Sequence, residues 1–289
     1  MTHVLLDERP ILADDERYNA SLVARSDETE SLGYFTVRFD GEPTPFEAGQ
    51  YMTIGVFTET DLGPRIVQRP YSIASDPGVA GTEGYEMYVR LVNGGQFTPL
   101  LWRMPLGQRM RMIGPKGKFT LLPDDHRTHL FISSGTGNAP FVAMMRRMLR
   151  ERATRRAVFL NGVSYQHELG YRRLVEDWAA SGAYPVTYVP SVSRRSAPEN
   201  AGWTGRWGRV ESVLEPVLDD LGLNPANSIA YICGNPDMIL TAEQTLLGRG
   251  YPEEQVKTEL YWPKGKEPPR GAADGGEAAN AAAAADEGE

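Results

Sequence analysis

The fold of this chain is decided by residues 130–145, which read LFISSGTGNAPFVAMM. The apolar run predicts a buried strand, the glycine-rich segment predicts a tight loop, and Pro140 pre-sets the first turn of a following helix. Gly135 and Gly137 let the backbone approach a phosphate at a helix N-terminus, where anions are favoured. The spacing matches neither a Walker A loop nor G-x-G-x-x-G, so a plain strand–helix connection stays an alternative.

The sequence that follows repeats the pattern of an apolar strand and a helix. We expect strands at residues 129–133, 157–160, 185–189 and 229–233. Such alternation is typical of a doubly wound α/β domain with a parallel sheet. We place this domain at residues 126–262.

The sequence before residue 130 has a different texture. Residues 34–39 and 85–92 alternate apolar and polar positions, and Gly, Pro and Asp-Gly turns separate such runs. The pattern predicts an antiparallel β-barrel or sandwich, which we place at residues 17–125 after an N-terminal extension at 1–16. Residues 263–289 hold little that can be buried, so we expect a disordered, acidic, low-complexity tail there.

Composition excludes several classes of function. The net charge of −8 and the lack of a basic block argue against a nucleic-acid partner. A single cysteine, Cys233, excludes an intrachain disulfide and a cysteine-held iron–sulfur cluster. Four scattered histidines predict no metal site, and no apolar run is long enough for membrane insertion. The chain start shows no leader, so we expect a cytoplasmic protein. We also expect a monomer.

Two segments of the N-terminal half suggest a flavin site. In residues 69–75, RPYSIAS, an Arg can clamp a pyrophosphate, a Tyr ring can lie against an isoalloxazine and a Ser can bond a ring nitrogen. In residues 94–99, GGQFTP, we expect Thr98 as N-cap and Pro99 as first residue of a short helix whose N-terminus attracts phosphate. The alternatives are an ordinary edge strand and a capped helix without a ligand.

Three features of the C-terminal half suggest a nucleotide site. The second strand ends at Asn161 and Gly162 with no acidic residue for a 2′-hydroxyl, while four arginines follow at 194, 195, 206 and 209. This balance favours a 2′-phosphate, hence NADPH. Cys233 and Gly234 end a late strand at the edge where α/β sheets bind ligands, and Glu259, Tyr261 and Trp262 end the fold.

In order and spacing these segments resemble the ferredoxin/flavodoxin–NADP(+) reductase family, bacterial type, over residues 17–262. Residues 46–51, FEAGQY, and 114–117, GPKG, also match its pattern. The resemblance implies a β-barrel FAD-binding domain followed by an α/β NADP-binding domain. It also implies FAD as cofactor, NADPH/NADP+ as co-substrate, and ferredoxin and/or flavodoxin as partner. Hydride transfer to the flavin and two single-electron steps would follow.

The resemblance assigns roles residue by residue. It implies that the flavin and its diphosphate are held by Arg69, Pro70, Tyr71, Ser72, Gly95, Gln96, Phe97 and Thr98. It implies that NADP is held by Gly135, Thr136, Gly137, Asn138, Ala139, Pro140, Arg194, Arg209, Cys233 and Gly234. Ser72, Cys233, Glu259 and Tyr261 would tune the reaction, with Tyr261 stacked on the flavin and Trp262 over the adenine.

Two alternatives stay open. One is an NADH-dependent flavin reductase component of an oxygenase system, which the arginines after residue 193 disfavour. The other is a non-catalytic flavin- or nucleotide-binding redox sensor.

Overall fold

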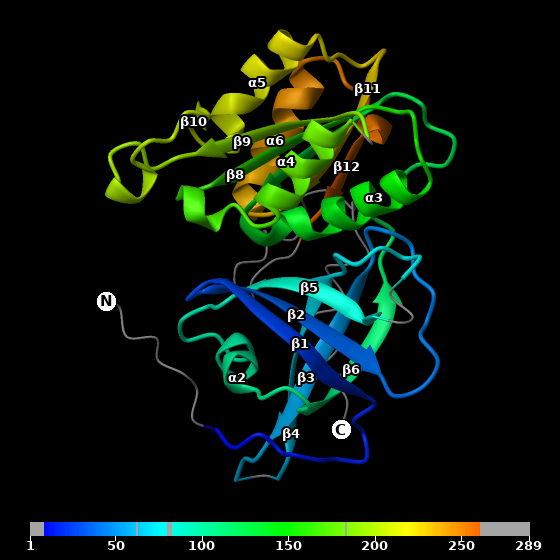
Figure 1. The fold of residues 1–289 in the computed structure, drawn as a ribbon, viewed down its shortest axis with the longest axis vertical. Helices are drawn as coiled ribbons and strands as arrows, with labels where there is room; N and C mark the ends of the chain where they lie inside the picture. Colours follow the sequence, from blue (N-terminus) through cyan, green and yellow to red (C-terminus); the bar gives the residue numbers. More distant parts are fainter. Residues whose placement is uncertain (1–8, 62, 80–82, 183, 261–289) are drawn as a thin grey trace. The chain divides into compact units, whose positions relative to one another are not determined.

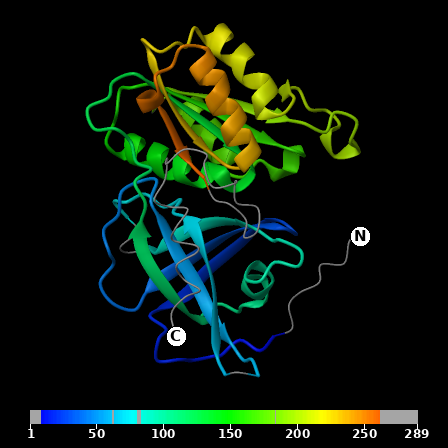
Figure 2. The ribbon, with the colours of Figure 1, turned by 180° about the vertical axis from the view of Figure 1, so that it is seen from behind.

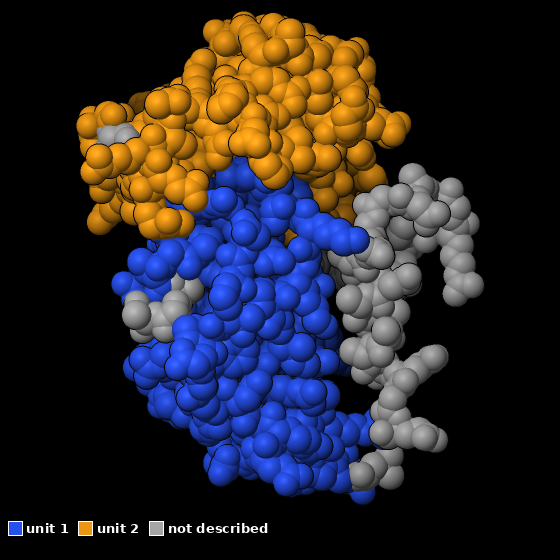
Figure 3. Space-filling view, turned by 90° about the vertical axis from the view of Figure 1, so that its right-hand side faces the viewer, with its two compact units in different colours: residues 1–121, 139–147 blue, residues 122–138, 148–289 orange. Residues whose placement is uncertain are grey.

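The computed structural model describes residues 9–61, 63–79, 83–182 and 184–260 (Figure 1). The chain forms two compact units. Unit 1 comprises Met1–Leu121 and Ala139–Arg147, and unit 2 comprises Leu122–Asn138 and Met148–Glu289, coloured blue and orange in Figure 3. Each unit has its own sheet.

Unit 1 contains a six-stranded sheet in the order β4-β3-β6-β1-β2-β5, with every pair antiparallel. A bridge between Ile73 and Met87 joins the chain after β4 to β5, so the sheet closes on itself. The predicted antiparallel barrel is thereby confirmed. Its strands are β1 (Ala20–Thr29), β2 (Leu32–Phe39), β3 (Tyr51–Thr58), β4 (Arg65–Ser72), β5 (Tyr85–Arg90) and β6 (Arg109–Lys116).

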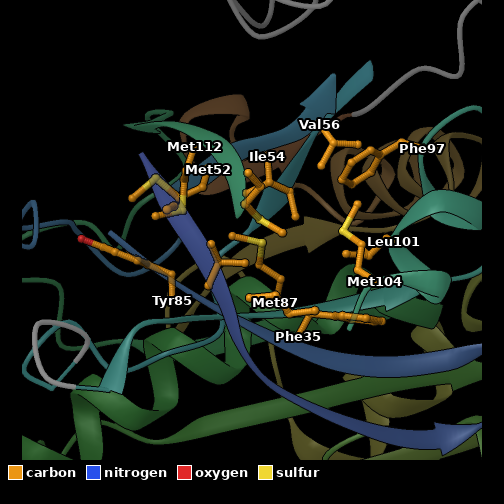
Figure 4. Close-up of a cluster of buried hydrophobic side chains, with 14 of the residues drawn as sticks. Phe35, Met52, Ile54, Val56, Tyr85, Met87, Phe97, Leu101, Met104 and Met112 are labelled. Carbon is orange, nitrogen blue, oxygen red and sulfur yellow. The ribbon is translucent and has the colours of Figure 1, made fainter. Parts of the chain in front are cut away.

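The barrel is filled by alternate residues of its strands and by a short helix, α2 (Thr98–Arg103). Figure 4 shows Phe97, Leu101 and Met104 from the α2 segment beside strand residues such as Ile54 and Phe35. All five side chains are buried. Burial of an alternating strand face is what the sequence pattern predicts. The helix is therefore anchored by apolar packing, which holds the preceding loop in place.

Residues 9–12, which we assigned to an N-terminal extension, lie against the end of β3. Ile11 forms a bridge with Thr58, and the Leu12 amide donates a 2.9 Å hydrogen bond to the Phe57 carbonyl. The Tyr18 hydroxyl donates to the Leu12 carbonyl and accepts from the Phe57 amide. The described part of the extension is thus bonded to the barrel.

Unit 2 contains a six-stranded parallel sheet in the order β10-β9-β8-β7-β11-β12. The direction of the order reverses at β7, which creates a switch point between β7 and β11. The doubly wound α/β prediction is thereby confirmed. The strands are β7 (Thr128–Ser134), β8 (Ala157–Val163), β9 (Val186–Val192), β10 (Arg206–Trp207), β11 (Ser228–Cys233) and β12 (Val256–Glu259).

Helices of unit 2 cover both faces of this sheet. Helices α5 (Val210–Leu221) and α6 (Pro236–Gly248) pack on one face, in front in Figure 2, and α4 (Arg172–Ser181) packs on β9 at the other. Helix α3 (Ala139–Arg150), whose residues up to Arg147 belong to unit 1, follows a 3-10 turn, η1 (Gly135–Asn138). Further short turns of unit 2 are η2 (Gln166–Glu168), η3 (Pro198–Asn200) and η4 (Glu253–Gln255). The carboxyl ends of the parallel strands carry the loops that lead into these helices and turns.

Candidate functional site

Two of the predicted flavin motifs meet in unit 1. Arg69 lies on β4, and its Nη2 donates a 3.1 Å hydrogen bond to Oε1 of Gln96. Its Nη1 donates to the carbonyl of Gln68, which fixes the direction of the guanidinium. The structure thus brings together two sequence segments that lie 27 residues apart.

Tyr71 places a polar atom in apolar surroundings. Its ring lies 6.0 Å from the Phe97 ring, centroid to centroid, and it packs against the barrel core. Desolvation raises the pKa of its hydroxyl well above the ordinary range. Among the described residues the hydroxyl makes no hydrogen bond, so it is open to solvent or to a bound molecule. Pro70 and Ser72 flank it on β4, opposite Thr53 and Tyr51.

The loop before α2 differs from our prediction at Thr98. Phe97, not Thr98, occupies the N-cap position, and Thr98 and Pro99 are the first residues of the helix. The Thr98 hydroxyl instead accepts a 3.0 Å hydrogen bond from the Val92 amide across the loop. The physical reason is that the chain turns back after Val92 and leaves this amide without a strand partner.

Gly95 makes this turn possible. Its amide donates to the Val92 carbonyl at 2.9 Å, and a Cβ on Gly95 would lie only 2.9 Å from that oxygen. A Cβ on the neighbouring Gly94 would meet no atom within 4 Å. The loop is closed on one side and open on the other.

These residues fit a flavin nucleotide. Arg69 offers a guanidinium for a diphosphate, the loop of Gly95 and Gln96 offers backbone groups, and Tyr71 offers an aromatic ring with a hydroxyl that bonds no described residue. The residues that would hold FAD are therefore those of β4 and of the loop before α2.

In unit 2, the predicted phosphate loop packs against the predicted nicotinamide residues. A Cβ on Gly137 would lie 2.4 Å from the Cys233 carbonyl oxygen and 2.5 Å from the Gly234 Cα. A Cβ on Gly135, whose φ is +54°, would meet nothing within 4 Å. Only glycine fits at 137, while the space at Gly135 is open for a ligand. Thr136 lies half-buried between these two glycines.

The residues at the end of this loop are packed inside the protein. The Asn138 side chain is buried, and its Nδ2 donates a 3.1 Å hydrogen bond to the Gly170 carbonyl. Its Oδ1 has no partner among the described residues. Ala139 and Pro140 are buried at the start of α3. We assigned all three to nucleotide contact; their side chains are packed inside the protein.

Cys233 and Glu259 are direct neighbours on adjacent parallel strands. Both are buried, with 3% and 4% of their surface exposed. Burial raises the pKa of the Cys233 thiol, and the Glu259 carboxylate raises it further. The thiol is therefore protonated at neutral pH and is no nucleophile, which agrees with a positioning role.

Sequence reasoning missed Ser134, which secures the turn after Cys233. Its Oγ accepts a 2.9 Å hydrogen bond from the Asn235 amide. Gly234 has a φ of +146°, and a Cβ there would lie 2.5 Å from that Oγ. The signal available in the sequence was Ser134 itself, a polar residue between an apolar strand and Gly135.

A buried row of polar side chains crosses the sheet beside Cys233 and was also missed. Ser133 pairs in register with Cys233 on one side and Asn161 on the other. The Ser133 hydroxyl donates a 3.0 Å bond to Asn161 Oδ1, and Asn161 Nδ2 donates to the Tyr188 hydroxyl at 3.4 Å. The row of Glu259, Cys233, Ser133 and Asn161 places polar atoms along one edge of the sheet.

The four arginines between residues 194 and 209 separate into two classes. Arg206 forms an ion pair with Asp220, and the Arg195 guanidinium lies 5.3 Å from the Trp207 ring centroid. Arg194 and Arg209 are exposed, and their side chains form no hydrogen bond or ion pair with the described residues. They follow the carboxyl ends of the neighbouring strands β9 and β10. These two are the arginines we assigned to the 2′-phosphate.

Tyr261 and Trp262, assigned to the flavin, lie outside the described residues, as does the predicted tail. Within the described part of the chain, no group of three or more His, Cys, Asp or Glu side chains gathers to hold a metal ion. No helix there is long and apolar enough to cross a membrane.

Comparison with known proteins gives two matching family models. The oxidoreductase FAD-binding domain matches residues 19–121, and the oxidoreductase NAD-binding domain matches residues 131–244. The chain is thus an oxidoreductase with a FAD-binding and an NAD(P)-binding domain.

Individual relatives carry several roles. The chain is 31% identical over 228 residues to ferredoxin–NADP reductase B of Sorangium cellulosum, covering 78% of this chain and 88% of that protein. It is 28% identical to the phenol 2-monooxygenase reductase component DmpP of a Pseudomonas strain, covering 86% of this chain but 66% of that longer protein. The solved structure of the ferredoxin reductase in carbazole 1,9a-dioxygenase superposes with a TM-score of 0.70 at 26% identity, covering 85% of this chain and 69% of that one.

Proposed function

This chain belongs to the ferredoxin–NADP reductase family, and on that premise we propose that it transfers electrons between NADPH and a one-electron carrier, ferredoxin or flavodoxin. Bound FAD supplies the exchange of one hydride for two single electrons. The protein supplies positioning, charge and exclusion of water.

The residues of each unit have distinct tasks in this proposal. Arg69 and the Gln96 loop hold the diphosphate, while Tyr71 offers its ring and its hydroxyl to the flavin. In unit 2, Gly137 lets the loop approach Cys233 closely, and the protonated Cys233 presents a neutral surface beside the Glu259 carboxylate. A neutral thiol adds bulk without adding charge where a hydride is to leave a nicotinamide.

The observation that carries the NADPH assignment is that the exposed guanidinium groups of Arg194 and Arg209 form no hydrogen bond or ion pair with any described residue. They follow the ends of neighbouring strands, and the end of β8 offers Asn161 and Gly162 rather than a carboxylate. A 2′-phosphate accepts hydrogen bonds from such arginines, whereas a 2′-hydroxyl favours an acidic partner.

Steady-state kinetics with NADPH and NADH test the assignment. We expect Arg194→Ala and Arg209→Ala each to raise the KM for NADPH about tenfold, the loss of one exposed charge-assisted contact, and to leave the KM for NADH unchanged. Arg206→Ala is the matched control, because Arg206 is already paired with Asp220, and it should change the KM for NADPH less than about twofold. Equal losses with both nucleotides would contradict the assignment.

A second candidate is an NADH-dependent reductase component of an oxygenase system, favoured by the likeness to DmpP and to the carbazole dioxygenase reductase. Anaerobic titration of the flavin absorbance with NADPH and NADH separates the two functions. Bleaching at a lower concentration of NADPH supports our proposal, and the reverse order supports the oxygenase-type reductase. Reduction of ferredoxin and flavodoxin in turnover then identifies the carrier.

A further inference from the structure

The loop that carries Arg194 contains one buried amide side chain, that of Asn200. Residues 193–205 connect β9 to β10, and Asn200 ends the turn η3 within this loop. Only 2% of the surface of Asn200 is exposed. Buried polar atoms need hydrogen-bond partners, so the bonds of this amide identify the groups that it holds together.

The Asn200 amide bonds the backbone of two other segments. Its Nδ2 donates to the carbonyl of Arg194 and to the carbonyl of Ser164, each at 3.0 Å. Its Oδ1 accepts a 2.7 Å hydrogen bond from the Gln166 amide. Ser164 and Gln166 follow the end of β8, whereas Arg194 follows the end of β9. Asn200 therefore joins the loops after two neighbouring strands of the parallel sheet.

The backbone of Arg194 is thereby fixed at both of its polar groups. Its amide donates to the Ser164 carbonyl at 3.3 Å. Its carbonyl accepts from Asn200 Nδ2 and, at 3.1 Å, from the Ala197 amide. The side chain of Arg194 is exposed and bonds no described residue. An exposed cationic side chain on a fixed backbone is suited to bind an anion, because less conformational freedom is lost on binding.

We propose that Asn200 is a positioning residue for the 2′-phosphate of NADPH, which it serves by fixing the backbone of Arg194. This inference rests on the proposed function, because it takes Arg194 as a ligand of that phosphate. Both N–H groups of the amide are taken by protein carbonyls, so Asn200 acts on the phosphate only through Arg194. The preference for NADPH over NADH then depends on a buried amide six residues after the arginine.

Calorimetric titration of the full chain with NADP+ and with NAD+ tests the inference. We expect Asn200→Ala to weaken NADP+ binding about fivefold, because Arg194 keeps its charge but loses its fixed backbone, and to leave the affinity for NAD+ unchanged. Asn200→Ser, whose hydroxyl can donate one hydrogen bond, should lie between Asn200→Ala and the parent. The unchanged affinity for NAD+ also shows that each variant is folded.

Gln166→Ala is the matched control, because it removes hydrogen bonds between the same two loops without changing those at Arg194. The Gln166 side chain donates to the carbonyls of Glu199 and Ala201, at 2.8 and 3.1 Å. This variant should bind NADP+ like the parent. Equal weakening of NADP+ binding in Gln166→Ala and Asn200→Ala would show that both residues only support the fold of the loops, and it would overturn the proposal.

A double-mutant cycle shows whether Asn200 acts through Arg194. In the Arg194→Ala background, Asn200→Ala should cause no further loss of NADP+ affinity, because the side chain that it positions is gone. In the Arg209→Ala background, the same substitution should still weaken NADP+ binding about fivefold. A full additional loss in the Arg194→Ala background would contradict the proposal, as would parent-like NADP+ binding by Asn200→Ala.

Failure of the proposed function gives a different result. If the parent binds NADP+ and NAD+ with equal affinity, or if Arg194→Ala keeps the preference of the parent, the assignment of Arg194 to the 2′-phosphate falls, and the inference on Asn200 falls with it. If Arg194→Ala loses that preference and Asn200→Ala keeps it, only the inference on Asn200 falls.

Discussion

At the scale of single residues, His129 is a base whose pKa is strongly shifted by burial. It is fully buried on β7, and its Nδ1 hydrogen-bonds the Arg127 carbonyl at 2.9 Å, so Nδ1 carries the proton. Nε2 has no partner among the described residues. Burial lowers the pKa of His129 to about 4. The folded state therefore keeps this imidazole neutral.

This pKa predicts an acid-dependent loss of stability. Between pH 6.5 and pH 4 the unfolded chain binds a proton at His129 that the folded chain does not. The contribution of the neutral His129 to the free energy of unfolding is therefore complete above pH 6.5 and is lost as the pH falls toward 4. The full contribution is about 3 kcal/mol. Urea unfolding at pH 7 and at pH 4.5 measures it.

The control for this prediction is a substitution without an ionisable ring. His129→Phe should lose less unfolding free energy between the two pH values than the parent, whatever its stability at pH 7. His167→Gln, at an exposed position on η2, should keep the pH dependence of the parent. The same pH dependence in His129→Phe as in the parent would refute the role of His129.

At the scale of elements, the turn η1 and the end of β11 fit each other only through glycine. A Cβ at Gly137 would overlap the backbone of Cys233 and Gly234, which side-chain rotation cannot relieve. We expect Gly137→Ala to displace η1, to lower the free energy of unfolding by about 1–3 kcal/mol and to weaken NADPH binding. Thermal unfolding and a nucleotide titration check both effects.

Gly248→Ala is the matched control for this substitution. Gly248 ends α6, and a Cβ there would meet no atom within 4 Å. Alanine is favoured over glycine in a helix, so this variant should be as stable as the parent or slightly more stable. Parent-like nucleotide binding by Gly137→Ala would show that the loop tolerates the displacement.

At the scale of the whole molecule, the two units have separate cores and separate candidate sites. Ligands that bind only the folded chain stabilise it, by about 2.7 kcal/mol at a hundred times the dissociation constant. We expect Arg69→Ala to reduce the gain in unfolding free energy that FAD gives and to preserve the gain that NADP+ gives. Arg209→Ala should do the opposite.

Unfolding followed by calorimetry with each ligand alone measures these gains. The crossed pattern is the expected result, because each arginine serves one ligand. Loss of both gains in either variant would mean that the substitution damages the fold rather than a single site. If Arg209→Ala lost the stabilisation by FAD and kept the stabilisation by NADP+, the assignment of Arg209 to the nucleotide would be contradicted.

Local periodicity was sufficient to predict the architecture. Alternation at residues 34–39 and 85–92 predicted antiparallel strands, and apolar runs followed by helices predicted the parallel sheet. These patterns are set by which side of an element is buried, and that information lies within a few neighbouring residues. The glycines of the loop at 135–137 were likewise visible in the sequence, since their conformational demands are local.

Long-range partners were decided only by the tertiary structure. The sequence could not show that Arg69 bonds Gln96, that Asn138 bonds Gly170, or that Asp220 pairs with Arg206. Each of these contacts depends on strand register and on loops that bring distant segments together, and no local pattern encodes such a pairing. The sequence by itself therefore determined the two sheets and the kinds of groups available. The tertiary structure decided which of those groups are bonded to one another and which are left to a ligand.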